Sequence, residues 1–266
     1  MELQESFDER KAEIENYIQL LEHIDMTMQS GNILLTVRRA SSATSQENTD
    51  NEYAVTPTQQ KIMFSCLYMQ LYNLVESTVI GCLTELEVSV RSTKALDWLR
   101  INDKLKEELL LSWVRQYGHT LGEGNRKDLL NLITSMLESN AMLPFYIDKR
   151  RNGGNWDDKE IENLIKGIGM NHNFDGPIYH SAKKHINTGV IPRYNNCGGL
   201  ELIKKFRNEL AHGEVSFVQC GERLDLVQLK ELSQIVFDYL QAVINHFTSF
   251  ITNKEYLLAC TSGISH

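Results

Sequence analysis

Apolar residues recur at helical spacing along most of the chain, and alternating runs typical of strands are nearly absent. We therefore expect an all-α protein. One helix is predicted from about Phe7 to Met28, and a longer one begins at the capping pair Thr56-Pro57 and continues through Leu86. Between them, the stretch from Ile33 to Val37 is the candidate for an extended segment, and the polar run 40–52 is expected to be a flexible loop.

The central part of the chain has a less regular pattern than the two ends. Helices are expected from about Asp103 to Tyr117 and from Arg126 to Glu138. Between residues 140 and 196, runs of Gly, Asn and Asp surround one short helix, roughly Asp157 to Ile168. This region is therefore expected to be an irregular insertion.

Two further helices are predicted near the end of the chain. The first follows the Gly198-Gly199 break and ends near Ala211. After a polar loop, the second runs from about Asp225 to Ile251 and has an apolar face wide enough for a bundle core. The predicted organisation is an N-terminal helix and loop over 1–55, a helical domain over 56–252 that contains the insertion, and a tail over 253–266.

Composition indicates the cellular setting and limits the cofactors. The chain has 266 residues, of which 42% are apolar and 23% charged, as is ordinary for a globular protein. No apolar run approaches the roughly 20 residues of a membrane span, and the charged N-terminus is unlike a signal peptide, so we expect a cytoplasmic protein without membrane contact. Five scattered cysteines form no C-x-x-C pair, and no cofactor or metal is expected.

The charge distribution bears on the class of partner. A net charge of −8 argues against a protein that coats nucleic acid nonspecifically. Residues 146–212, however, contain eleven Lys and Arg against eight Asp and Glu, while the rest of the chain has 16 against 27. A polyanion would be drawn to this region, although the same charges could simply form a solvated basic face.

The candidate chemistry lies at the end of the helix that precedes Gly213. Arg207 and His212 are separated by four residues, and Asn208 and His212 are one turn apart, so all three side chains can reach one ligand. A guanidinium binds phosphate oxygens in bidentate fashion, and an imidazole titrates near neutral pH and can move protons. The spacing alone would occur about once by chance in a chain of this composition, and it favours a helix end at which Arg207 is solvated and His212 caps the last carbonyl groups.

The wider block GGLELIKKFRNELAHGEVSF, followed by a long helix, resembles the HEPN superfamily, especially its stand-alone bacterial nuclease-like members. The resemblance rests on Arg207, Asn208, His212, Gly213-Glu214, Ser216-Phe217, the segment LYNLVESTV at 71–79, and the segment from Gly154-Asn155 to Gly169. These blocks cover roughly half the chain, and residues before Gln60 or after Ile251 contribute nothing to it.

The resemblance implies a four-helix core with metal-independent endoribonuclease activity, in a homodimer whose two motifs share one cleft. Arg207 would bind the scissile phosphate, His212 would transfer protons, and Asn208 would support them, with Glu76 as a further supporting residue. Asn73 is a second possible supporting residue because it lies among apolar neighbours on the same helix, although both residues could equally be exposed on a helix that is buried on one side. In a toxin subgroup regulated by a nucleotidyltransferase antitoxin, a tyrosine stands two residues after the histidine. Glu214 occupies that position here, so this regulation is not expected.

The residues predicted to contact RNA are Lys204, Lys205, Arg150 and Arg151. Trp156 is expected to be a packing residue, although its polar loop makes it the tryptophan to test for stacking on a base. A bacterial defence or toxin system, with an antitoxin or regulatory protein as partner, is the context that the resemblance implies. The alternative is a noncatalytic helical module that binds a partner protein or a nucleotide in the same cleft.

Overall fold

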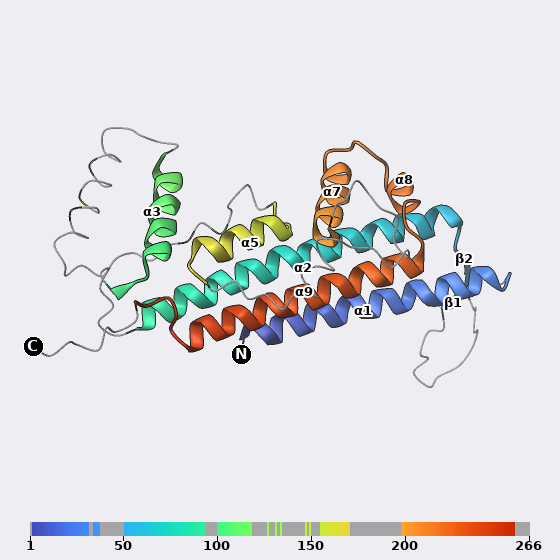
Figure 1. Ribbon diagram of the computed structural model, residues 1–266. Coiled ribbons are helices and arrows are strands. Elements are labelled where there is room, and N and C mark those ends of the chain that lie inside the picture. The colour runs from blue at the N-terminus through green and yellow to red at the C-terminus, as the bar shows by residue number, and fades with distance from the viewer. Residues whose placement is uncertain are drawn as a thin grey trace, which may run out of the picture.

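The computed structural model describes residues 2–31, 34–37, 51–93, 100–118, 155–170 and 198–258, with five isolated residues between 127 and 149. The described residues form seven helices and one two-stranded antiparallel ribbon (Figure 1). In chain order the elements are α1 (Glu2–Gln29), β1 (Leu34–Val37), β2 (Asn51–Ala54), α2 (Pro57–Ser92), α3 (Asp103–Gly118), α5 (Asp158–Gly167), α7 (Gly199–Ala211), α8 (Phe217–Gly221) and α9 (Leu226–Thr252). The helices dominate, which confirms the predicted fold class.

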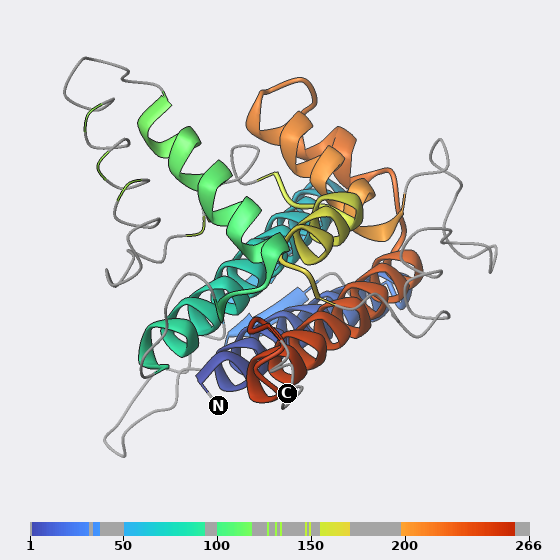
Figure 2. The ribbon, with the colours of Figure 1, turned by 60° about the vertical axis from the view of Figure 1, so that its left-hand side comes forward.

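The three longest helices, α1, α2 and α9, lie side by side along the molecule (Figures 1 and 2). α1 packs against both α2 and α9, and α2 also contacts α9. Each helix contributes a row of buried side chains three or four residues apart, such as Ile14, Ile18 and Leu21 in α1, so one face of each closes a common core. Since burying one such side chain stabilises by roughly 1.5–3 kcal/mol, α1 is an integral part of the fold.

Local sequence determines where the helices begin. The Thr56 hydroxyl accepts a hydrogen bond from the Gln59 N–H (3.3 Å), and the Gln59 side chain accepts one from the Thr56 N–H (2.9 Å). Pro57 stands at the first helical position, where its missing N–H has no intrahelical partner to lose. The same reciprocal arrangement starts two other helices, between Ser216 and Gln219 in α8 and between Asp225 and Gln228 in α9.

The shorter helices form two groups beside the three long helices. α7 and α8 pack against α2, and α7 also contacts α9, while α3 packs against α5. The chain that follows α9 returns to the start of α3, where the Leu258 N–H donates to the Arg100 carbonyl (2.7 Å) and the Asn102 N–H donates to the Tyr256 carbonyl (2.9 Å). Among the described helices, none combines the length and the apolar character that crossing a membrane requires.

In the first third of the chain, one expectation agrees with the structure and two differ from it. The segment expected to be extended forms β1, which pairs with β2 so that Leu34 lies opposite Ala54. Asn51 and Glu52 belong to β2 and not to a flexible loop, because the β1 backbone supplies their pairing. α2 continues past Leu86 to Ser92, since buried residues at helical spacing persist to Val90.

Two differences concern the second half of the chain. The polar loop before α9 contains α8, whose five residues are too few for apolar spacing to show a helical period. The helix predicted from Arg126 to Glu138 and most of the 140–196 insertion lie outside the described residues. Within the insertion, the expected short helix is present as α5.

Candidate active site

The C-terminal end of α7 carries the three residues of the predicted motif. Gly213 ends the helix with a φ of +71°, a left-handed conformation that glycine adopts most easily. Its N–H donates to the Leu210 carbonyl (3.2 Å), and the Glu214 N–H donates to the Glu209 carbonyl (2.9 Å), which is a Schellman motif. His212 is therefore the C-cap residue of α7, and its side chain is exposed.

Replacing Gly213 with Ala is expected to lower the free energy of unfolding by about 1 kcal/mol, because a Cβ strains the left-handed conformation. The cost should come from the backbone alone, since no atom lies within 4 Å of the added Cβ. Gly31, with a φ of +76° and equally open surroundings, is the matched control and should show a similar loss. Urea unfolding measures both variants. An unchanged Gly213→Ala protein would show that α7 does not end in this way.

Arg207 lies one turn before the end of α7, and its guanidinium is stacked on an aromatic ring. Its Cζ is 4.2 Å from the centroid of the Tyr72 ring in α2. Its Nη1 group donates a hydrogen bond to Asn208 Oδ1 at 2.8 Å. The side chain is partly buried. One face and one edge of the guanidinium are thus held by the protein.

Arg207 has no ion pair with a described carboxylate, whereas two neighbouring cationic side chains do. Lys204 forms an ion pair with Asp157, and Arg223 forms one with Glu209. No carboxylate in the described part of the chain forms an ion pair with Arg207. A guanidinium partly withdrawn from water and without a carboxylate favours an anionic ligand, and its planar fork matches phosphate oxygens.

Tyr72 connects three elements at this site. Its side chain is fully buried, its ring lies against the Arg207 guanidinium, and its hydroxyl accepts a hydrogen bond from the Trp156 backbone N–H at 3.1 Å. Burial raises the pKa of Tyr72, and the charge of Arg207 and the Trp156 hydrogen bond oppose that rise. The phenol therefore stays protonated at neutral pH, and Tyr72 joins α2 to α7 and to the segment before α5.

The two residues of α2 predicted to support the motif differ in their surroundings. Glu76, one turn after Tyr72, is partly buried, and its charge adds to the effect of burial in raising the pKa of Tyr72. Asn73 is exposed. Glu76 is therefore close to the ring that carries Arg207, whereas no described contact links Asn73 to the motif.

Lys204 and Lys205, predicted to contact RNA, lie on α7 and are partly buried. The Lys204 ammonium is paired with Asp157, the N-cap residue of α5, whose Oδ1 accepts a hydrogen bond from the Glu160 N–H at 2.8 Å. Lys204 thus holds the start of α5 against α7. A contact between Lys204 and RNA would have to share the ammonium with this carboxylate.

Arg150 and Arg151, the other two residues predicted to contact RNA, lie outside the described residues. Their neighbour Lys149 is described, and its ammonium forms an ion pair with Glu87 of α2 at 2.9 Å. This contact places Lys149 beside the C-terminal half of α2.

Trp156 is a core residue, as expected, although the residues around it in the sequence are polar. Its side chain is 1% exposed and belongs to the apolar core. The buried indole N–H has no hydrogen-bond partner among the described residues. A ring in this position cannot stack on a base, which agrees with the expected packing role of Trp156. Trp156 packs in the core directly before the start of α5.

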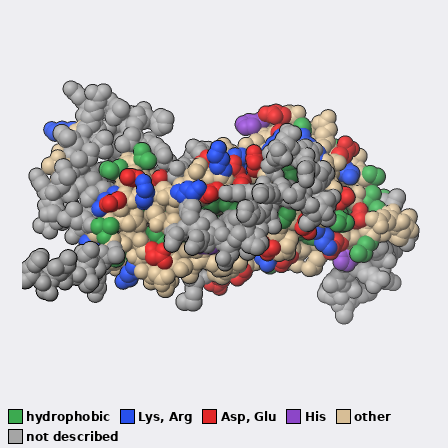
Figure 3. Space-filling model, viewed as in Figure 1, with side chains coloured by type: hydrophobic (Ala, Val, Ile, Leu, Met, Phe, Trp, Pro, Cys, Tyr) green, Lys and Arg blue, Asp and Glu red, His purple; other side chains and the backbone are tan. Residues whose placement is uncertain are grey.

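On the face in Figure 3, side chains of both charges are mixed over the described surface, without a continuous basic patch. The described residues also include no group of three or more His, Cys, Asp or Glu side chains that could hold a metal ion. The candidate site is therefore defined by individual contacts around Arg207.

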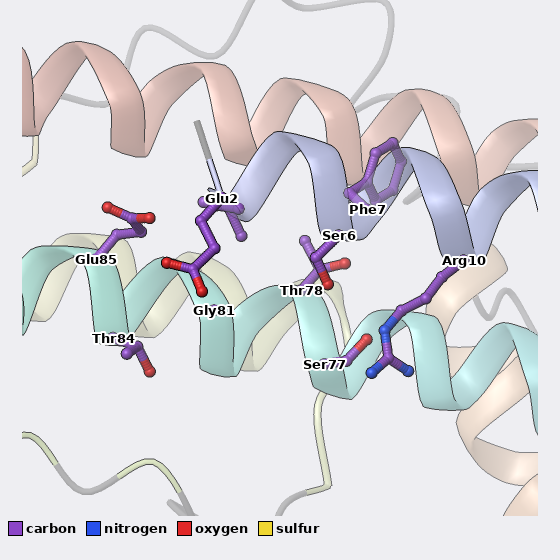
Figure 4. Close-up of a pocket in the computed structure, with 10 residues that line it drawn as sticks. Glu2, Ser6, Phe7, Arg10, Ser77, Thr78, Gly81, Thr84 and Glu85 are labelled. Carbon is purple, nitrogen blue, oxygen red and sulfur yellow. The ribbon is translucent and has the colours of Figure 1, made fainter.

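A pocket of about 250 Å³ lies between α1 and α2 (Figure 4). Arg10 and Ser77 lie toward one end of it, and Glu2 and Glu85 toward the other. The lining residues are Glu2, Leu3, Ser6, Phe7, Arg10, Ser77, Thr78, Gly81, Thr84 and Glu85, and thus none from α7. Because its two carboxylates would repel an RNA phosphate, the end of α7 remains the candidate site.

A known protein family covers nearly the whole chain. The model of the family described as MAE_28990-like HEPN matches residues 1–256. A search of curated proteins and a search of solved structures found no match. The matched region includes α1, which carried none of the sequence resemblance but packs in the same core as α2 and α9. The chain belongs to the MAE_28990-like HEPN family.

Proposed function

We propose that the protein is an endoribonuclease that cleaves RNA without a metal ion, through Arg207 and His212. HEPN domains are typically ribonucleases. The observation that carries the proposal is the state of Arg207. Its guanidinium is stacked on Tyr72, anchored by Asn208, partly buried, and without an ion pair to any described carboxylate. These are the properties of a phosphate-binding arginine.

In the proposed reaction, the RNA 2′-oxygen attacks the adjacent phosphorus and the bond from phosphorus to the 5′-oxygen breaks. A neutral imidazole at His212 accepts the 2′-hydroxyl proton, and a protonated one donates a proton to the departing 5′-oxygen. Arg207 offsets the negative charge that develops on the phosphoryl oxygens. Asn208 orients Arg207 through Oδ1, and its amide NH₂ group can donate to a phosphate oxygen.

A second copy of the chain is part of the proposal. His212 is exposed at the tip of α7, and its imidazole has no hydrogen-bond partner among the described residues. One imidazole cannot be neutral base and protonated acid at once, whereas two copies facing one cleft could divide these roles. We place the activity in a defence or toxin system under the control of a regulatory protein, because unrestrained RNA cleavage would arrest growth.

Cleavage of a labelled RNA by the purified protein is expected to proceed in excess EDTA and to leave a 2′,3′-cyclic phosphate and a 5′-hydroxyl. A single 2′-deoxy substitution at the cut site should abolish cleavage there, because it removes the nucleophile. End-group mapping by mass spectrometry measures both effects. Loss of activity in EDTA, or cutting at the 2′-deoxy linkage, would contradict the mechanism.

The alternative is a noncatalytic module that binds a nucleotide or a partner protein with the same residues. The exposed, unanchored imidazole favours it, because a proton-transfer group is normally oriented by a hydrogen bond. In that case the protein would bind RNA or nucleotide in an Arg207-dependent manner and cut no RNA under any condition.

A further inference from the structure

We infer that Tyr72 is a positioning residue for Arg207, and that its buried ring holds the guanidinium ready for a phosphate. This inference rests on the proposed function. The ring centroid lies 4.2 Å from Arg207 Cζ, and the Tyr72 side chain has no exposed surface. The segment 71–79 of the family resemblance contains Tyr72 but gives it no role in the site, because it stands in an apolar run and has the spacing of a core residue.

The stacking geometry leaves the guanidinium able to bind a ligand. The ring covers a face of the guanidinium, and Asn208 Oδ1 accepts from Nη1, so the N–H groups on the other edge are not used by these two contacts. An arginine side chain loses much rotamer freedom when it binds phosphate. If the protein already holds the Arg207 side chain in place before RNA binds, part of this entropy cost no longer weakens substrate binding or slows the reaction.

The chemistry of a phenol explains why a tyrosine suits this role. A carboxylate would also hold Arg207, but it would neutralise the charge and compete with phosphate. The neutral phenol attracts the cation through its π face, while its hydroxyl accepts the Trp156 N–H at 3.1 Å and so fixes the ring.

Arg223 provides the contrast within the same molecule. Its Cζ lies 4.6 Å from the centroid of the Phe206 ring, so it too is stacked on a buried aromatic side chain. Arg223 is also paired with Glu209. The Glu209 carboxylate therefore neutralises the charge of Arg223, as expected of a structural arginine. Arg207 also lies against an aromatic ring but forms no ion pair with a described carboxylate.

The first test compares Tyr72→Leu and Tyr72→Phe with Tyr68→Leu. Tyr68 is equally buried in α2, and its ring meets Phe206 edge-on at 4.9 Å. At a temperature where all three variants are folded, Tyr72→Leu should lower kcat/KM for RNA cleavage by roughly tenfold, and Tyr72→Phe by no more than about twofold. Tyr68→Leu should lose stability but keep kcat/KM. Equal losses in Tyr72→Leu and Tyr68→Leu would overturn the inference.

The second test needs no activity. In protein labelled with ¹⁵N-arginine, the Arg207 Nε–H signal, assigned with Arg207→Lys, should be shifted upfield by the Tyr72 ring current. Tyr72→Leu should remove the shift, and Tyr72→Phe and Tyr68→Leu should keep it. An Arg207 signal that Tyr72→Leu leaves in place would show that the stacking is absent.

The two tests separate failure of this inference from failure of the proposed function. If the wild type cuts no RNA, the proposed function fails. The inference about Tyr72 is then tested by measuring how tightly the wild type and each variant bind an RNA strand with 2′-deoxy residues. A weaker affinity in Tyr72→Leu but not in Tyr68→Leu would then support the positioning role. An unchanged affinity would overturn it.

Discussion

Replacing Arg207 with Ala is expected to lower kcat for RNA cleavage by about 10²- to 10³-fold, the usual effect of removing a group that stabilises developing negative charge. Stability should change little, because the guanidinium is only partly buried and forms no ion pair with a described carboxylate. Single-turnover cleavage of a labelled RNA measures the rate, and thermal unfolding checks the fold. Arg207→Lys should recover little activity, because an ammonium lacks the planar fork that stacks on Tyr72 and binds two oxygens.

The matched control for this prediction is Arg223→Ala. Arg223 is stacked on Phe206 but paired with Glu209, so its removal should cost stability and leave the rate of the folded protein nearly unchanged. Equal loss of rate in Arg207→Ala and Arg223→Ala would show that activity follows the integrity of α7 and not the charge at position 207.

The same assay tests the shared cleft. His212→Ala should be as inactive as Arg207→Ala, and light scattering should give the mass of a dimer for both. When wild-type protein is mixed with an excess of His212→Ala protein and allowed to exchange subunits, each mixed dimer keeps only one of the two imidazoles that divide the proton transfers. The wild-type activity should therefore fall below the value expected from dilution alone. An unchanged wild-type activity from proteins shown to exchange would contradict a cleft that two copies share.

The sequence predicted most helices because their signals are local. Thr56-Pro57 and Asp225 mark helix starts through hydrogen bonds to residues three positions later, and Gly213 marks the end of α7 through its backbone conformation. α8 has the same kind of capping pair, Ser216 and Gln219, but its five residues are too few to show the apolar spacing that predicts a helix.

The candidate site was only partly predictable, since its remaining members depend on tertiary contacts. Asn73 and Glu76 looked alike in the sequence, because α2 is apolar on most sides and the pattern could not show which face meets α7. Tyr72 has the spacing of a core residue, and its contact with Arg207 becomes visible only when α7 is packed against α2. The polar residues around Trp156 leave base stacking open as an alternative to packing, and only the folded structure shows that the ring turns inward.

Replacing Gly221 with Ala is expected to lower the free energy of unfolding by about 3 kcal/mol, at the upper end of the cost of overpacking. Gly221 is the buried last residue of α8, which packs against α2. An added Cβ would lie 1.9 Å from the carbonyl oxygen of Lys61 and 2.6 Å from its carbonyl carbon. These atoms belong to the backbone of α2, so the clash can be relieved only by moving one helix away from the other.

Gly81→Ala is the matched control, because its added Cβ would also clash, at 2.6 Å, but with the end of the Leu3 side chain. A leucine can change rotamer, so Gly81→Ala should cost clearly less than Gly221→Ala. Urea unfolding followed by circular dichroism gives both free energies. Gly221→Ala should also slow RNA cleavage, since α8 begins only a few residues after His212 and its displacement would move the end of α7. If Gly221→Ala were as stable as Gly81→Ala, the close contact between α8 and Lys61 would be disproved. The idea that α8 anchors the motif to α2 would then be disproved as well.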